Sequence, residues 1–321
     1  MLLKSMKINN LLSFDENCED IELDNLNIII GPNGSGKSNF IQSISLLKAA
    51  STDLKGTINK GGGISEWLWK GSKNYPEAHI KAVTSVKSYN SDIPISYELG
   101  FTSSGDRFEI VKEYIADNEP RKQGVGEPYT YYKNQSGELP CLNAFNEKIN
   151  RKRKLVTINR EDINLEKSIL EQLKEPYSYP ELYNIADKFS KIMIYRNIST
   201  NQNSLIRSAQ QSDLQTDVVL EDGSNLALFY NYLNGTDEYK EILNEITQIY
   251  NGIEDIVTKM NAGKIILNLR ENINDKQTLI PASRLSDGTL QYLFLLAILF
   301  NPTPPPLICL EEPEMGLHPD L

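Results

Sequence analysis

The segment "GPNGSGKS", residues 31–38, combines the residue types that hold a chain of phosphates. Its glycines let the backbone wrap around the phosphates, so that N–H groups and the start of a following helix face the negative charge. Lys37 is placed to reach the β and γ phosphates, and the Ser38 hydroxyl to bind Mg²⁺. We assign the contacts with a nucleotide to Gly31, Pro32, Asn33, Gly34, Ser35, Gly36, Lys37, Ser38 and Asn39.

Two neighbouring carboxylates follow a short apolar run in "LICLEEPE", residues 307–314. A metal bound to a nucleotide and an attacking water both require carboxylates at the tip of a strand beside a phosphate loop. Glu311 stands where the acid that organises the metal belongs, and Glu312 where a base polarises water. Glu312 and Lys37 are therefore the candidate catalytic residues, and Ser38 and Glu311 the candidate metal ligands. An acidic strand end that only faces solvent is the alternative interpretation.

A third segment, "RLSDGTLQYLFLLAILF" at residues 284–300, sets a polar turn on an apolar helix. The turn consists of Ser286, Asp287 and Gly288, and the predicted helix starts at Thr289. A hydroxyl, free backbone N–H groups and a helix N-terminus together bind anions. An ordinary N-capped buried helix would explain the hydrophobicity equally well, but not the presence of the other two motifs in the same chain.

Strands and helices must position these three segments. The apolar run Leu26–Ile30 predicts a buried strand directly before the glycine-rich loop, and the apolar spacing over residues 38–49 predicts a helix directly after it. A helix over Thr289–Phe300 and a strand over Leu307–Leu310 place the glutamates beyond the carboxyl end of a strand, where α/β sheets bind ligands. The sequence therefore predicts an α/β fold of the P-loop NTPase class.

The middle of the chain alternates between strand and helix patterns, with a hairpin turn at residues 103–106. Strands are predicted at residues 79–88, 95–102, 107–116, 191–195 and 264–269. Helices are predicted at residues 163–174 and 237–250. We divide the chain into an ATPase lobe at 1–140 with the P-loop and an antiparallel sheet, a mainly helical insertion at 141–277, and residues 278–321, which complete the same ATPase head.

Together, "GPNGSGKSN", "LSDGTLQ" and "LICLEEPEMGLHP" resemble the ATP-binding-cassette-type heads of SMC/RecF-like P-loop ATPases. More narrowly, they resemble the bacterial AAA-family ATPases related to the OLD family. The resemblance covers both ends of the chain and hardly the middle. It implies a mixed core sheet with a small antiparallel β lobe and a helical insertion lobe, ATP and Mg²⁺ as ligands, and a homodimer. In that dimer the signature turn, here Ser286 to Gly288, caps the γ-phosphate held by the second subunit.

The sequence departs from the pattern of these heads at several positions. The signature reads LSDGT rather than LSGGQ, and Glu311 replaces the more usual aspartate. Such heads continue with a further helix, strand and switch histidine, so we expect either a longer protein or a partner that completes the sheet. Neither His79 nor His318 stands where that histidine belongs. Arg196 and Asn197 follow the strand predicted to lead into the Q-loop, whose role stays open.

Composition excludes several other classes of protein. A formal charge of -10 argues against a surface coated with positive charge for nucleic acid, although "NRKRKLVTINR" at residues 150–160 is either a contact for DNA or a solvated face. The three cysteines are widely spaced, which predicts no disulfide framework or zinc site and fits the cytoplasm. The longest apolar run, Tyr292–Phe300, is about half of the roughly 20 residues of a membrane span.

The leading hypothesis is an ATP-hydrolysing head that dimerises around ATP. The resemblance adds bacterial DNA repair or antiphage defence with a nuclease or toxin-like partner. Two alternatives stay open: an ATP-gated scaffold with negligible hydrolysis, and the ATPase subunit of a transporter, against which the long insertion speaks.

Overall fold

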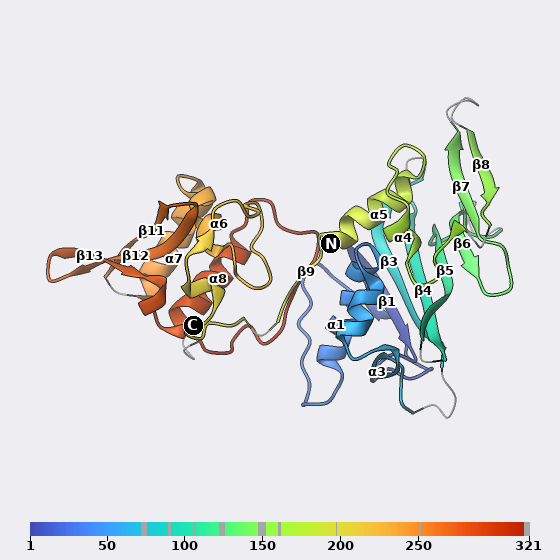
Figure 1. Ribbon diagram of the computed structural model, residues 1–321, viewed down its shortest axis with the longest axis horizontal. Coiled ribbons are helices and arrows are strands. Elements are labelled where there is room, and N and C mark those ends of the chain that lie inside the picture. The colour runs from blue at the N-terminus through green and yellow to red at the C-terminus, as the bar shows by residue number, and fades with distance from the viewer. Residues whose placement is uncertain are drawn as a thin grey trace. The chain divides into compact units, whose positions relative to one another are not determined.

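The structure is a computed structural model that describes residues 1–71, 76–88, 91–105, 107–121, 126–146, 152–159, 162–196, 198–250 and 252–317 (Figure 1). It divides into two compact units, Met1–Ile192 and Met193–Leu321. This division differs from the predicted boundaries at 140 and 277. The reason is that strands in the expected helical insertion extend the sheet of the first unit, whereas later strands form a sheet of their own.

An eight-stranded sheet dominates the first unit, with the order β2-β1-β3-β4-β5-β6-β7-β8. All its pairs are antiparallel. Its strands are β1 (Leu3–Asn9), β2 (Ile21–Glu22), β3 (Ala78–Lys87), β4 (Pro94–Ser104), β5 (Arg107–Asp117), β6 (Thr130–Gln135), β7 (Cys141–Asn146) and β8 (Lys152–Thr157). Side chains of β3 alternate between buried and less buried, as expected for a sheet covered on one face. The predicted hairpin between β4 and β5 is confirmed, and the sheet is larger than the small lobe expected.

Five helices described in the first unit accompany this sheet. They are α1 (Lys37–Ala50), α2 (Leu54–Lys60), α3 (Ile64–Trp67), α4 (Ile169–Gln172) and α5 (Pro180–Ser190). Helix α5 contacts both α1 and β3. The buried ring of Tyr97 on β4 meets Phe189 of α5 edge-on, with centroids 5.5 Å apart. These contacts give α1, the helix after the glycine-rich loop, a fixed place beside the sheet (Figure 1).

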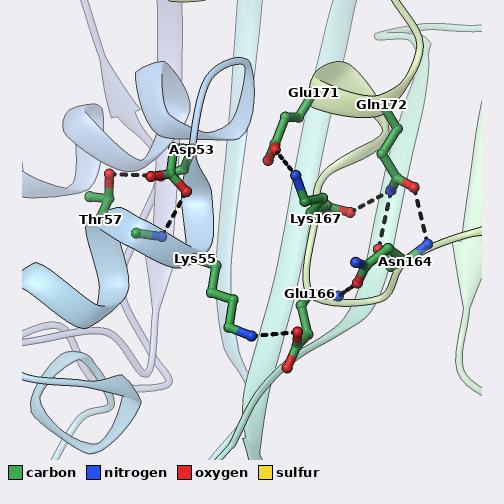
Figure 2. A network of polar contacts seen from close by, with 9 residues as sticks. Asp53, Lys55, Thr57, Asn164, Glu166, Lys167, Glu171 and Gln172 are labelled. Atoms are coloured by element: carbon green, nitrogen blue, oxygen red, sulfur yellow. Dashed lines mark hydrogen bonds and ion pairs between the residues drawn. The ribbon is translucent and has the colours of Figure 1, made fainter.

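Polar contacts tie the segment before α4 to helix α2 (Figure 2). Lys55 Nζ lies 2.5 Å from a carboxylate oxygen of Glu166, 111 positions away in sequence. The Asn164 side-chain oxygen accepts a hydrogen bond from the backbone N–H of Glu166. This contact closes an Asx turn, which competes with helix formation. The predicted helix over residues 163–174 is therefore wrong for most of its length, and only Ile169–Gln172 is helical.

A buried carboxylate, Glu113 on β5, joins the sheet to the start of α4. It accepts hydrogen bonds from Tyr97, from Ser168 and from the backbone N–H of Ile169. Burial raises the pKa of Glu113 to about 7, and these hydrogen bonds oppose that rise. Because the folded protein holds a proton that the unfolded chain loses near pH 4.5, Glu113 stabilises the fold most at low pH.

Replacing Glu113 with glutamine is expected to remove this pH dependence. The contribution of Glu113 to the free energy of unfolding is complete below pH 4.5 and is lost as the pH rises through about 7. The difference in free energy of unfolding between wild type and Glu113→Gln should therefore fall from pH 5 to pH 7 and level off above. Urea unfolding followed by fluorescence measures it, because both tryptophans, Trp67 and Trp69, lie in the first unit. A difference independent of pH would contradict the assignment.

The second unit contains two sheets and three α-helices among its described residues. Strands β10 (Gln210–Gln211), β11 (Ile253–Asn261), β12 (Lys264–Ile273) and β13 (Lys276–Pro281) form one antiparallel sheet. Strands β9 (Met193–Tyr195) and β14 (Ile308–Leu310) pair in parallel. The helices are α6 (Leu226–Leu233), α7 (Asp237–Ile249) and α8 (Asp287–Leu299). The helices predicted near 237–250 and 289–300 are thus confirmed, as are the strands predicted to end at Tyr195 and Leu310.

Helix α8 is the centre of the second unit's core. Phe294 is fully buried and its ring meets that of Tyr195 on β9 edge-on at 5.5 Å. The Tyr230 hydroxyl of α6 donates to the Leu293 carbonyl over 2.7 Å. The apolar run of residues 290–298 is therefore core, and it holds both the polar turn that precedes it and strand β9.

Replacing Phe294 with alanine is expected to lower the free energy of unfolding of the second unit by about 3–5 kcal/mol, because it leaves a cavity in a packed core. Leu299 on the same helix is 69% exposed, so Leu299→Ala should change stability by less than about 0.5 kcal/mol. Urea unfolding followed by far-UV circular dichroism compares the two variants. Equal losses would contradict the assigned packing.

One predicted element is absent. The segment Leu26–Ile30 was expected to be a buried strand, but no strand is assigned there, and its large apolar side chains are 46–87% exposed. Apolar composition alone does not make a strand, because a strand needs a neighbour to pair with. At the start of this segment Asp24 and Asn27 bond to each other. In the described part of the chain, no helix is long and apolar enough to cross a membrane.

Candidate functional site

The glycine-rich loop leads directly into α1. Gly34 and Gly36 have φ angles of 81° and 96°, which side chains other than glycine rarely adopt. Gly36 is the N-cap of α1, and no side chain caps this helix end. The backbone N–H groups of the first turn therefore point out of an uncapped terminus without a nearby acidic residue. This is the geometry that binds a phosphate.

Lys37 lies over the loop. Its ammonium group donates to the carbonyl oxygens of Gly31 and Pro32, over 2.6 and 2.9 Å. Ser38 is exposed in the first turn of α1, so its hydroxyl is accessible to a ligand. The loop backbone closes on itself through a bond from the Ser35 N–H to the Pro32 carbonyl. These bonds hold the loop and the first turn of α1 together.

A residue outside the motif supports the loop. Ser13, which follows β1, accepts a hydrogen bond of 2.8 Å from the Asn39 amide. A Cβ at Gly36 would come within 2.9 Å of the Ser13 hydroxyl, which would have to move. A groove of about 500 Å³ opens here, with Trp69 and Leu68 among its walls. Sequence reasoning missed Ser13, because it lies 26 positions from Asn39 and belongs to no motif.

The two candidate carboxylates follow β14. Because β9 and β14 are parallel, Arg196 and Glu311 leave the same edge of their sheet, and Arg196 Nε lies 3.2 Å from a Glu311 oxygen. Burial raises the pKa of the Cys309 thiol on β14 to about 11, and the positive charge of Arg196 opposes this shift. The carboxyl edge of this sheet thus carries a cation and an anion side by side, as expected for a site that handles charged ligands.

Glu312 has an unusual backbone conformation. Its φ is 49°, in the left-handed region that residues with a Cβ rarely adopt. The Glu312 carbonyl accepts the Met315 N–H over 3.0 Å, which closes a turn after the strand. The side chain is exposed. Such strained positions occur frequently at functional sites.

Of the predicted polar turn Ser286–Gly288, only Ser286 precedes α8, as its N-cap, because the helix starts at Asp287, two residues earlier than predicted. The Ser286 hydroxyl accepts the Thr289 N–H over 3.1 Å and lies 2.7 Å from the Thr289 hydroxyl. A hydroxyl accepts two hydrogen bonds and donates one. When Thr289 donates, Ser286 keeps its own proton for an outside acceptor. Both Ser286 and Asp287 are exposed.

Two contacts of this turn involve residues that sequence reasoning did not identify. Arg207 bonds to Asp287 over 2.6 Å, and a side chain at Gly288 would come within 3.0 Å of the Gly316 carbonyl. Gly288 is therefore required for close packing against the segment that follows Glu312. No local pattern could indicate the Arg207 contact, which joins positions 80 apart.

The predicted site residues fall on both units. The glycine-rich loop lies in the first, whereas the carboxylates and the polar turn lie in the second. His318 and Asn197 lie outside the described residues, as do Arg151 and Arg160 of the basic cluster. Lys152, Arg153 and Lys154 are on β8.

The candidate metal ligands suit magnesium chemically. Ser38 offers a hydroxyl oxygen and Glu311 a carboxylate, both hard ligands of the kind Mg²⁺ prefers. Among the described residues, no three His, Cys, Asp or Glu side chains cluster to bind a metal on their own. Mg²⁺ bound to nucleotides uses one or two protein ligands and completes its shell with phosphates and water. When bound, Mg²⁺ would neutralise negative charge on the phosphates.

One known protein family matches most of the chain. Residues 26–321 match the family described as "AAA domain, putative AbiEii toxin, Type IV TA system". The match includes the glycine-rich loop, the polar turn and the two glutamates. No curated protein matches the chain. Because the family covers most of the sequence, the chain belongs to this AAA-domain family and is a P-loop ATPase domain of the α/β class.

Proposed function

We propose that two copies of this chain close around two ATP molecules and hydrolyse them. The observation that carries the proposal is the turn at Ser286–Gly288, an exposed anion-binding end formed on a unit other than that of the P-loop. When Thr289 donates to Ser286, the Ser286 hydroxyl proton and the helix N-terminus suit a phosphate oxygen. A γ-phosphate held by the P-loop of a second copy is the ligand that this chemistry fits.

The residues divide the chemistry between them. Lys37 and the first-turn N–H groups of α1 hold the β and γ phosphates, and Ser38 and Glu311 hold Mg²⁺. Glu312 accepts a proton from water as the water oxygen bonds to the γ-phosphorus and the bond from that phosphorus to the bridging oxygen of ADP breaks. The turn of the second copy stabilises charge on the γ-phosphoryl group.

For the biological role, we propose bacterial defence or DNA repair with a nuclease or toxin-like partner. The support is the name of the family, which refers to a toxin of a type IV toxin–antitoxin system. DNA contact through the basic residues of β8 is part of this proposal.

The arrangement across two copies is tested by mixing two defective variants. Lys37→Ala removes the phosphate contact, and Ser286→Arg blocks the turn. In a mixed dimer, one of the two sites combines an intact P-loop with an intact turn. We expect each variant alone to lack ATPase activity and an ATP-dependent increase in mass, and the mixture to regain both. Circular dichroism melting and ATP binding to its own P-loop check that Ser286→Arg is folded, because Ser286 caps α8.

A mixture that stays inactive and monomeric, while wild type dimerises with ATP, would contradict capping across two copies. A wild-type mass that light scattering finds unchanged by ATP and Mg²⁺ would contradict dimerisation itself.

A further inference from the structure

Arg207 is a buried cation behind the polar turn. It ends the short 3-10 helix η2 (Leu205–Arg207), and its side chain is only 7% exposed. Nε donates to the Thr200 carbonyl over 2.6 Å. Nη1 donates to the carbonyls of Ala282 and Leu285, over 3.1 and 2.6 Å, and Nη2 donates to Asp287 over 2.6 Å. Four of the five donors of the guanidinium thus have acceptors.

We propose that Arg207 is a positioning residue for phosphate recognition by the Ser286–Gly288 turn, and that it offsets the charge of Asp287 there. This inference rests on the proposed function, in which the turn receives a γ-phosphate. Both roles follow from contacts within the second unit.

The first role concerns the shape of the turn. Arg207 binds the carbonyl of Leu285, which directly precedes Ser286, and the carboxylate of Asp287, which directly follows it. The contact with Ala282 fixes the 3-10 helix η3 (Ala282–Arg284) on the same guanidinium. A planar fork of five donors can hold acceptors in several directions at once, whereas a lysine ammonium has only three donors on a flexible stem. Arg207 therefore holds the residues on both sides of Ser286.

The second role concerns charge. Asp287 is 65% exposed and stands next to Ser286, so its carboxylate would repel an approaching phosphate. The Arg207 guanidinium, permanently charged, cancels that negative charge at 2.6 Å. The N-terminus of α8 then remains net positive toward the ligand. Arg207 is thus what makes an aspartate compatible with phosphate binding at this position.

The test compares the ATP concentration that gives half-maximal dimerisation, measured by light scattering, among single and double variants. Arg207→Gln should raise this concentration about tenfold or more, because a charge-assisted contact is lost and Asp287 is left uncompensated. Adding Asp287→Asn to Arg207→Gln should recover the part of the loss that comes from the uncompensated charge of Asp287, but not the part that comes from the lost backbone contacts. Asp287→Asn alone completes the double-mutant cycle, which measures the coupling between the two side chains. Arg284→Gln, at an exposed arginine beside the same turn, is the matched control and should behave as wild type.

Arg207→Lys distinguishes the two roles. It also replaces Arg207→Gln in this experiment if that variant does not fold. It keeps the charge but cannot hold four acceptors, so the loss should persist and Asp287→Asn should not recover it. For each folded variant, the melting temperature measured by circular dichroism should equal that of wild type. The affinity of the P-loop for a fluorescent ATP analogue should also be unchanged.

The proposal is overturned if wild type dimerises with ATP and the folded Arg207 variants dimerise at the same ATP concentration. It is also overturned if Asp287→Asn restores nothing in the Arg207→Gln background. Failure of the proposed function gives a different result, because wild type would then not respond to ATP at all.

Discussion

Replacing Lys37 with alanine is expected to weaken ATP binding by about 100-fold and to remove ATP hydrolysis. The ammonium group lies over the phosphate loop, against the Gly31 and Pro32 carbonyls, and a phosphate chain would give it charge-assisted contacts instead. Losing two such contacts at about 1.5–3 kcal/mol each accounts for a change of this size. Hydrolysis suffers further, because the lysine also stabilises charge that develops in the transition state.

Equilibrium titration with a fluorescent ATP analogue and a phosphate-release assay measure the two effects. Lys60→Ala is the matched control, since Lys60 is exposed on α2 of the same unit and its loss removes the same charge. If Lys37→Ala binds the analogue as tightly as wild type does, the loop is not the nucleotide site.

Replacing Glu312 with glutamine is expected to lower the rate of ATP hydrolysis by about 10²–10⁴-fold while ATP binding remains. Glutamine keeps the size of the side chain but cannot accept a proton from water. Because the γ-phosphate then stays intact, the variant should accumulate as an ATP-bound dimer.

The assay pairs single-turnover hydrolysis with light scattering in the presence of ATP and Mg²⁺. Glu314→Gln is the matched control, because Glu314 is exposed two positions away in the same turn and has no assigned role. A scaffold with negligible hydrolysis would show no turnover to lose, so wild-type and Glu312→Gln rates would be equal. Equal losses from both substitutions would instead indicate a general effect of charge.

Sequence predicted best those elements whose information is local. The apolar spacing of residues 237–250 was enough to place α7, and the structure adds Thr236 as its N-cap. The glycine-rich loop could also be predicted from neighbouring residues alone, because its conformation uses positive φ angles at Gly34 and Gly36. The roles of the carboxylates and the polar turn remain predictions.

Features that depend on distant partners could not be predicted. Leu26–Ile30 has the composition of a buried strand, but it pairs with no described strand, and its side chains are exposed. The helix predicted from residue 163 starts only after Ser168, because Asn164 forms a turn with the backbone N–H of Glu166. The Ser13–Asn39 and Arg207–Asp287 contacts join positions 26 and 80 residues apart, and neither leaves a periodic signal in the sequence.

The Arg207–Asp287 contact has a consequence for how such a protein could diverge. The shape of the Ser286–Gly288 turn depends on residues 200–207, which lie far upstream in the sequence. Mutations there can change the shape of the turn while its own sequence stays the same. Two descendants with identical signatures could then respond to different cellular nucleotide levels. Motif-based comparison would group them as equivalent, whereas selection would act on the upstream loop.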